Sequence, residues 1–159
     1  MTRWTGGCQC GAVRFAVEGD LGRASICHCR MCQKAFGGFF GPLVSAPMGA
    51  FAWTRGAPAR FQSSNKVSRG FCAACGTPLT FEWSAEVMEL AIGTFDRAAE
   101  IRPVVQLATG SAMPWIHDLA DLPTPPPDQL AAVQAHYDSV VSYQHPDYDT
   151  AEWPPRGRS

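Results

Sequence analysis

The motifs Cys8-Gln9-Cys10-Gly11 and Cys72-Ala73-Ala74-Cys75-Gly76 share one design, a close pair of cysteines followed directly by glycine. A metal-binding turn folds backbone N–H groups onto its thiolates, and the residue after the second cysteine often needs a positive φ, which glycine adopts at little cost. Four thiolates at about 2.3 Å form a closed tetrahedral shell around zinc. We therefore predict one structural zinc site, which joins two distant parts of the chain and is formed by Cys8, Cys10, Cys72 and Cys75. The alternative is that these residues are ordinary buried thiols or disulfides.

The remaining cysteines, Cys27, Cys29 and Cys32, lie within six residues and are followed by Gln33 instead of glycine. Three protein ligands and one free position are typical of a reactive zinc site. Three thiolates give the zinc site a net charge of −1, so the ion is a poor Lewis acid for making hydroxide. It still accepts a fourth soft ligand, and a thiol bound there loses its proton. We therefore predict that this site handles an exogenous thiol.

Other interpretations of the same three cysteines stay open. One thiolate could act as a covalent nucleophile without metal, activated by Arg30 or Lys34. The group could also hold a second structural zinc completed by another residue, while an iron–sulfur cluster would need a fourth cysteine in reach. His28 lies between two ligands, and on an extended segment its side chain would point away from them, as a supporting or surface residue. His117 and Asp118 are a weak acid–base candidate.

The composition and charge of the 159-residue chain limit its function. It is 46% hydrophobic and fits one domain, and its net charge of −1 offers no surplus for binding nucleic acid. No apolar run approaches the roughly 18 residues of a membrane-spanning helix, and residues 1–7 lack the apolar segment of a secretion signal. We therefore expect a cytoplasmic protein without nucleic-acid or membrane partners, in which seven cysteines indicate metal binding or catalysis instead of disulfides.

Residues 12–111 consist mostly of short strand-like segments separated by turns. Residues 12–18 alternate, with Val13, Phe15 and Val17 on one face and Arg14 and Glu18 on the other. Short apolar and aromatic segments indicate further strands at 39–44, 50–53, 79–83 and 88–93. This pattern, with a short helix at 30–36, predicts an all-β or β-rich domain of antiparallel sheets.

A proline-rich run at 122–127 ends the predicted folded body, because proline fits neither a helix interior nor a central strand. Asp128 would then cap a helix through Tyr137, with an apolar stripe of Leu130, Val133 and Tyr137. We predict a zinc-binding domain at 1–127 and, at 128–159, a C-terminal helix and a loosely ordered tail. The loose order is assigned to the last dozen residues, which include Pro154, Pro155 and Gly157.

The three cysteine motifs, extended by Arg69-Gly70-Phe71 and by the later Pro114-Trp115-Ile116 and Asp121-Leu122-Pro123, resemble the glutathione-dependent formaldehyde-activating enzyme family, which includes centromere protein V. The resemblance implies several coiled antiparallel sheets, called a beta-tent, built around zinc. It implies two zinc ions per chain: a structural one on Cys8, Cys10, Cys72 and Cys75, and a catalytic one on Cys27, Cys29 and Cys32. Where family members often carry a His-Ile pair, this chain has Gln106-Leu107.

The family's reaction joins glutathione and formaldehyde into S-hydroxymethylglutathione, formally a carbon–sulfur lyase run in the synthetic direction. The resemblance thus implies glutathione, or a similar thiol, and a small aldehyde as partners, and it leaves a homo-oligomer open. For the two carboxylates of glutathione, the nearby cations in sequence are Arg30, Lys34, Lys66 and Arg69. Phe36, Phe39 and Phe40 are candidates for the pocket wall.

Two rival functions are compatible with the same motifs. The first is a non-catalytic zinc-binding module that mediates protein interaction. The second is metal-free redox chemistry by the Cys27–Cys32 group, against which the lack of a separate resolving cysteine counts.

Overall fold

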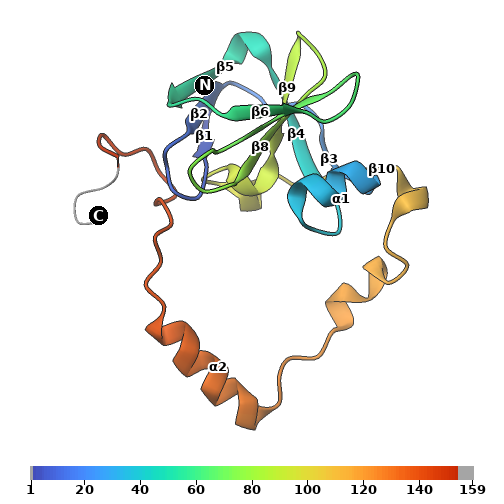
Figure 1. Cartoon of the computed structure of the whole chain (residues 1–159), viewed down its shortest axis with the longest axis vertical. Coiled ribbons are helices and arrows are strands. Elements are labelled where there is room, and N and C mark those ends of the chain that lie inside the picture. Colours follow the sequence, from blue (N-terminus) through green and yellow to red (C-terminus); the bar gives the residue numbers. More distant parts are fainter. Residues whose placement is uncertain (1, 154–159) are drawn as a thin grey trace.

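Two β-sheets form the body of the protein in the computed structural model, which describes residues 2–153 (Figure 1). The smaller sheet has the strand order β1 (Arg3–Gly7), β2 (Arg14–Glu18) and β5 (Phe51–Arg55). The larger sheet has the order β10 (Val105–Leu107), β3 (Ala24–Cys27), β4 (Gly41–Pro47), β9 (Val87–Ala91), β8 (Pro78–Glu82), β7 (Ser68–Phe71) and β6 (Ala59–Gln62). Neighbouring strands are antiparallel except for β10 and β3, which are parallel.

Helical elements are few and short. The α-helices are α1 (Arg30–Phe36) and α2 (Pro127–Ser139), and the 3-10 helices are η1 (Met48–Ala50), η2 (Ile92–Thr94), η3 (Ala98–Glu100), η4 (Thr109–Ser111) and η5 (Ile116–Asp121). The predicted fold class, mostly antiparallel sheet with a short C-terminal helix, is confirmed. None of the helices in residues 2–153 has the length and apolar character needed to cross a membrane.

The hydrophobic core lies between the two sheets. Phe15 and Val17 of β2 are fully buried, and they pack with Val44 of β4 and Leu90 of β9. Phe15 also meets Phe95 edge-to-face, with ring centroids 5.0 Å apart. The period-2 alternation of strands sends one face of each sheet into this core.

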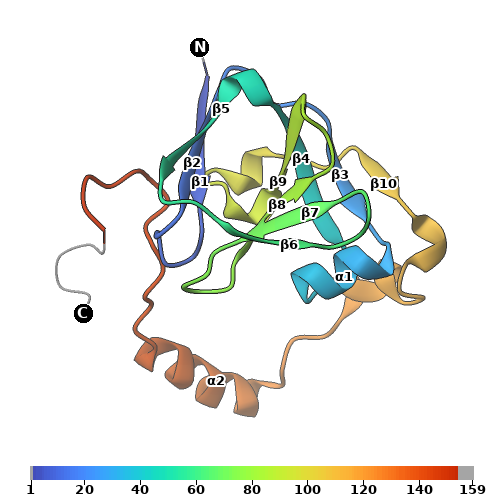
Figure 2. The same cartoon turned by 45° about the horizontal axis from the view of Figure 1, so that its top comes forward.

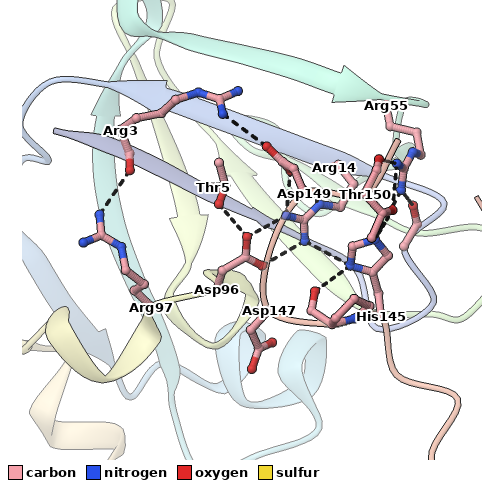
Figure 3. A network of polar contacts seen from close by, with 12 residues as sticks. Arg3, Thr5, Arg14, Arg55, Asp96, Arg97, His145, Asp147, Asp149 and Thr150 are labelled. Atoms are coloured by element: carbon pink, nitrogen blue, oxygen red, sulfur yellow. Dashed lines mark hydrogen bonds and ion pairs between the residues drawn. The ribbon is translucent and has the colours of Figure 1, made fainter. Parts of the chain in front are cut away.

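The outer face of β2 is covered as well, which the alternation alone does not predict. Arg14 points away from the core, yet it is only 3% exposed. Its guanidinium binds Asp96 and Asp149, and Asp149 comes from the C-terminal segment that returns to the body (Figure 3).

The chain beyond η5 leaves the body and then comes back. Figures 1 and 2 show α2 apart from both sheets, joined to them by extended segments. The helix begins at Pro127, Asp128 lies in its first turn without capping it, and the apolar stripe of Leu130, Val133 and Tyr137 is exposed.

Residues 145–153 are docked on the body. His145 is 3% exposed, and its backbone N–H donates to the Gln9 carbonyl at 2.7 Å. The Trp153 indole N–H donates to the Cys10 carbonyl. Within the last dozen residues, for which we expect loose order, buried Arg14 supplies a partner for Asp149. Pro154, Pro155 and Gly157 lie outside the described residues.

Candidate metal centres

The first centre brings together Cys8 and Cys10, which follow β1, with Cys72 and Cys75, which lie between β7 and β8. Their four Sγ atoms all lie within 4.8 Å of one another. The Cys8–Cys10 and Cys10–Cys72 sulfur distances are 3.6 and 3.8 Å. A tetrahedral zinc–sulfur shell with bonds of about 2.3 Å has edges of roughly 3.8 Å. The four cysteines therefore fit zinc in both donor type and spacing.

Glycine shapes both turns of this centre, as the motif predicts. Gly11 has φ 81° and Gly76 has φ 78°. Gly76 N–H donates to the Cys72 carbonyl at 2.8 Å, and Val13 N–H donates to the Cys8 Sγ at 3.3 Å. Gly11 is restricted further, because a side chain there would collide with the His145 ring.

The protonation of the four thiols differs from residue to residue. Burial raises the pKa of the Cys8, Cys10 and Cys72 thiols. Burial acts the same way on Cys75, but hydrogen bonds, first among them that with the Thr77 hydroxyl at 3.1 Å, lower the pKa of its thiol to about 6. The fold alone thus stabilises one thiolate, and a bound cation is needed to ionise the other three.

The second centre is built where β3 meets α1. Cys27 ends β3, Cys29 is the N-cap of α1, and Cys32 lies in the first turn, with all three Sγ atoms within 4.8 Å of one another. The Cys29 Sγ accepts a hydrogen bond from Cys32 N–H at 3.4 Å. A side chain at Gly41 of β4 would meet Cys32 Cβ and the Phe36 ring at 3.0 Å, so glycine allows α1 to pack this closely on the sheet.

The thiols of the second centre also differ in acidity. Burial raises the pKa of the Cys32 thiol to about 12, although Arg69 acts against it. At Cys29 burial is outweighed by hydrogen bonds, first that from Cys32 N–H, which lower the pKa of its thiol. Metal binding at neutral pH would therefore displace a proton from Cys32.

A cavity of about 210 Å³ opens beside the second centre. Cys27 and Cys32 line it, together with Arg23, which precedes β3, and with side chains from the face of the seven-stranded sheet opposite the core, which include Ser45, Phe81, Glu89 and Leu107. Ligand pockets usually reach roughly 300 Å³ or more. This cavity therefore suits a small molecule or one end of a larger one.

The strand register arranges the cavity floor in one row. Ser45 of β4 is opposite Glu89 of β9, Glu89 is opposite Phe81 of β8, and Phe81 is opposite Arg69 of β7. Ser45 Oγ donates to Glu89 Oε1 at 2.7 Å. Sequence reasoning missed Ser45 and Glu89, because a polar residue in an alternating strand normally indicates a solvated face.

Arg69 is buried at the far end of this row. It is 3% exposed, its Nη2 lies 3.3 Å from the Cys32 Sγ, and its Nε donates to the Ser63 hydroxyl at 3.0 Å. Its guanidinium carbon lies 4.7 Å from the centroid of the Phe81 ring. Of the four cations that the resemblance suggests for glutathione, Arg69 is the one that contacts a cysteine of the second centre.

The other three cations, Arg30, Lys34 and Lys66, are exposed. Arg30 and Lys34 lie on α1, and Lys66 lies in the turn between β6 and β7. Arg30 Nη1 donates to Gln33 Oε1 at 3.0 Å. The cavity is thus lined by Arg23 and by none of these three residues.

The aromatic residues suggested for the pocket wall lie elsewhere. Phe40 lines a separate cleft of about 650 Å³, Phe36 lines another cavity, and Phe39 packs edge-to-face on Trp115. Phe81 and Trp83 of the β8 region line the cavity beside Cys27 instead.

His28 belongs to that separate cleft, as alternation along an extended segment predicts. It is fully buried, so it is not a surface residue, and its Nε2 lies 2.9 Å from Gln106 Oε1. His117 lines the same cleft, while Leu107 lines the cavity of the second centre. Gln106, where the resemblance leads us to expect a histidine, thus contacts His28 and does not line the cysteine cavity.

Two further polar residues, Gln33 and His145, contact the segments that carry the two cysteine centres, and no sequence motif predicts either contact. Gln33 of α1 is buried and donates to the carbonyls of His28 and Ser111 at 2.8 and 2.9 Å. His145 lies against the turn of Cys8 and Cys10 within the Arg14 network (Figure 3). Both depend on contacts between segments far apart in the chain.

Comparison with known proteins agrees with these centres. The family model described as glutathione-dependent formaldehyde-activating enzyme matches residues 3–111. A solved structure of a Rhodobacter sphaeroides protein is similar in fold, with a TM-score of 0.53 and 21% sequence identity over 64% of this chain and 98% of that one. Residues 3–111, which the family model matches, contain both cysteine centres, Arg69 and the whole of both sheets. The chain therefore belongs to the glutathione-dependent formaldehyde-activating enzyme family.

Proposed function

We propose that this protein is a zinc-dependent enzyme of the carbon–sulfur lyase type, working in the cytoplasm. It would condense glutathione, or a similar thiol, with formaldehyde or another small aldehyde to an S-hydroxymethyl adduct. The observation that carries the proposal is the second centre: three cysteine sulfurs lie together at a cavity. Among residues 2–153 no histidine, aspartate, glutamate or fourth cysteine joins that group.

The two centres would divide the work. Cys8, Cys10, Cys72 and Cys75 supply a complete tetrahedral donor set, which favours a structural zinc. Cys27, Cys29 and Cys32 supply three donors, which would hold a zinc ion that accepts one further ligand. Bound there, zinc would supply a positive charge that favours the thiolate form of an incoming thiol.

The remaining chemistry falls to side chains of the cavity. The thiol sulfur forms a bond to the aldehyde carbon, the C=O π bond breaks, and the proton lost by the thiol ends on the new hydroxyl oxygen. Glu89 lines the cavity, so its carboxylate can take that proton and return it. Ser45 holds Glu89 in place through the 2.7 Å hydrogen bond. Arg23, with Arg30, Lys34 and Lys66 farther out, would serve the carboxylates of glutathione.

A non-catalytic zinc module that binds another protein is the second candidate. It is favoured by one feature of the C-terminal part, the exposed apolar side chains Leu130, Val133 and Tyr137 on α2. Single exposed apolar residues are common, whereas several on one helix indicate a contact surface. On this reading the second centre would hold its metal without exchanging ligands.

Zinc content and ligand exchange separate the two candidates. We expect two zinc ions per chain in the wild type and about one in Cys29→Ser, because that variant loses one of three ligands. Exchange between glutathione and formaldehyde, followed by NMR, should be accelerated by the wild type and not by Cys29→Ser. Met31→Ala, on the exposed side of the same helix, is the matched control and should behave as the wild type. Equal exchange rates with Cys29→Ser and the wild type would exclude the catalytic role.

A further inference from the structure

Arg69 is a buried cation, and its partners among the described residues include no carboxylate. Its contacts are the Cys32 sulfur, the Ser63 hydroxyl and the face of the Phe81 ring. Among residues 2–153 every ion pair involves another arginine. Arg60, on the neighbouring strand β6, shows the ordinary arrangement, since it is 43% exposed and paired with Glu82.

A guanidinium taken out of water requires compensation by negative charge. The contact with Phe81 gives part of it through the electrons of the ring, and the Ser63 hydroxyl gives a neutral hydrogen bond. Within residues 2–153, Cys32 is the one contact of Arg69 that can carry a full negative charge. Negative charge on the second centre would therefore compensate the buried guanidinium of Arg69.

The charge count of the second centre shows what Arg69 adds. Three thiolates and a divalent cation sum to −1, and an anionic guest at the fourth position would bring the sum to −2. Adding negative charge to a site that is already negative is unfavourable in a partly buried place. The positive charge of Arg69 cancels one unit, so the guest enters a centre of net charge zero.

We infer that Arg69 is the counter-cation of the Cys27–Cys29–Cys32 centre and that it makes this centre selective for an anionic sulfur guest over neutral ligands. The inference rests on the proposed function, since it concerns the same fourth position. The inferred role differs from that of a cation that binds a glutathione carboxylate, because the guanidinium contacts Cys32 and Arg69 is only 3% exposed.

The position of Arg69 is fixed from the other centre. β7 carries Arg69, and Cys72 of the four-cysteine centre directly follows that strand. The cross-strand pairing of Arg69 with Phe81 fixes the side on which the guanidinium lies. A cation in this place is thus part of the sheet framework, whereas Arg30 and Lys34 lie on the exposed surface of α1.

The test uses the cobalt(II)-substituted full chain and measures ligand affinity from the thiolate-to-cobalt absorption bands. Three ligands are titrated: glutathione, 2-mercaptoethanol, which has no carboxylate, and neutral imidazole. In Arg69→Met both thiols should bind about tenfold or more weakly, because one charge-assisted contact is lost, while the affinity for imidazole changes less than about twofold. Arg60→Met is the matched control and should bind all three ligands as the wild type does.

Each other result overturns the inference in a distinct way. Weaker binding of glutathione alone would show that Arg69 serves a carboxylate, and equal weakening of all three ligands would show a purely structural role. A wild type that binds neither thiol would overturn the proposed function itself. If Arg69→Met does not retain two cobalt ions, Arg69→Lys, which keeps the positive charge, is titrated in its place. The ratio of thiol affinity to imidazole affinity in Arg69→Lys should stay within about threefold of the wild-type ratio. A larger fall in this ratio contradicts the inference.

Discussion

Glu89 is the residue on which proton transfer depends in the proposed chemistry. It lines the cavity of the second centre and is held by Ser45. Glu89→Gln keeps the shape and the hydrogen bond but removes the base, so we expect the exchange rate to fall about 100-fold. NMR exchange measurements at saturating thiol check this. Glu86→Gln, an exposed neighbour, is the control, and a rate for Glu89→Gln within twofold of the wild type would remove Glu89 from the mechanism.

Thr77 sets the reactivity of Cys75 in the metal-free protein. Although burial acts to raise it, the hydrogen bond with the Thr77 hydroxyl helps to lower the pKa of the Cys75 thiol to about 6, so most of it is thiolate at pH 7. Thr77→Val removes that bond and raises the pKa, so alkylation of Cys75 by iodoacetamide at pH 7 should slow by roughly tenfold. The alkylation rates of Cys75 in the wild type and in Thr77→Val should converge at pH 10, where the Cys75 thiol is ionised in both proteins. Peptide mass spectrometry measures the labelling, with Thr109→Val as control.

At the scale of elements, the docking of residues 145–153 depends on Arg14, which Asp96 and Asp149 share (Figure 3). Asp96 is 6% exposed at its side chain, and Asp149 is 38% exposed. Asp96→Asn leaves a buried guanidinium short of charge and should lower the unfolding free energy by about 3–5 kcal/mol. Asp149→Asn should lower it by only about 1 kcal/mol, because solvent screens the pair. Urea unfolding measures both, with Glu18→Gln as an exposed control.

The Asp149 pair also has a defined pH dependence. Burial would raise the pKa of this carboxyl, but Arg14 and Arg3 lower it. Its contribution is therefore complete above the ordinary pKa of an aspartate, near 4, and is lost as the pH falls through the lowered value. The difference between Asp149→Asn and the wild type should be constant from pH 5 to 7 and should shrink below pH 4. A difference that grows on acidification would contradict this assignment.

Local chemistry explains which elements could be predicted from sequence. β2 alternates clearly, and α1 has Cys29 as its N-cap and Gly37 in the left-handed conformation at its end, so both are predictable. β1 (RWTGG) and β7 (SRGF) lack such alternation. They become strands because partner strands supply their hydrogen bonds, β2 for the edge strand β1, and β6 and β8 for β7. Pairing between distant segments decides these strands, which local periodicity cannot show.

The same division applies to the candidate site. Cysteine spacing and the glycines at positions 11 and 76 predict both ligand groups, because short motifs carry their own geometry. Glu89, Ser45 and the buried state of Arg69 follow only from the register of the large sheet. The contacts of His145 and Trp153 depend on the return of the C-terminal segment, which no local pattern encodes.

At the scale of the whole molecule, the four-cysteine centre connects the two sheets. Cys8 and Cys10 follow β1 of the small sheet, and Cys72 and Cys75 join β7 to β8 of the large one. Because metal binding is coupled to folding in such sites, chelation of zinc should lower the Tm by more than about 10 °C. Amide hydrogen exchange should quicken first in β1, β2, β7 and β8. Zinc should restore the protection and magnesium should not; protection in these strands that is unchanged by chelation would refute a structural role.

The detour of the backbone through α2 has a practical consequence for anyone who purifies this protein. Residues 122–144 are exposed throughout, whereas the stretch after them is fastened to Arg14, Arg55 and the backbone of Gln9 and Cys10. A protease that severs the loop at α2 would therefore yield two fragments that still elute together from a sizing column and separate only in detergent.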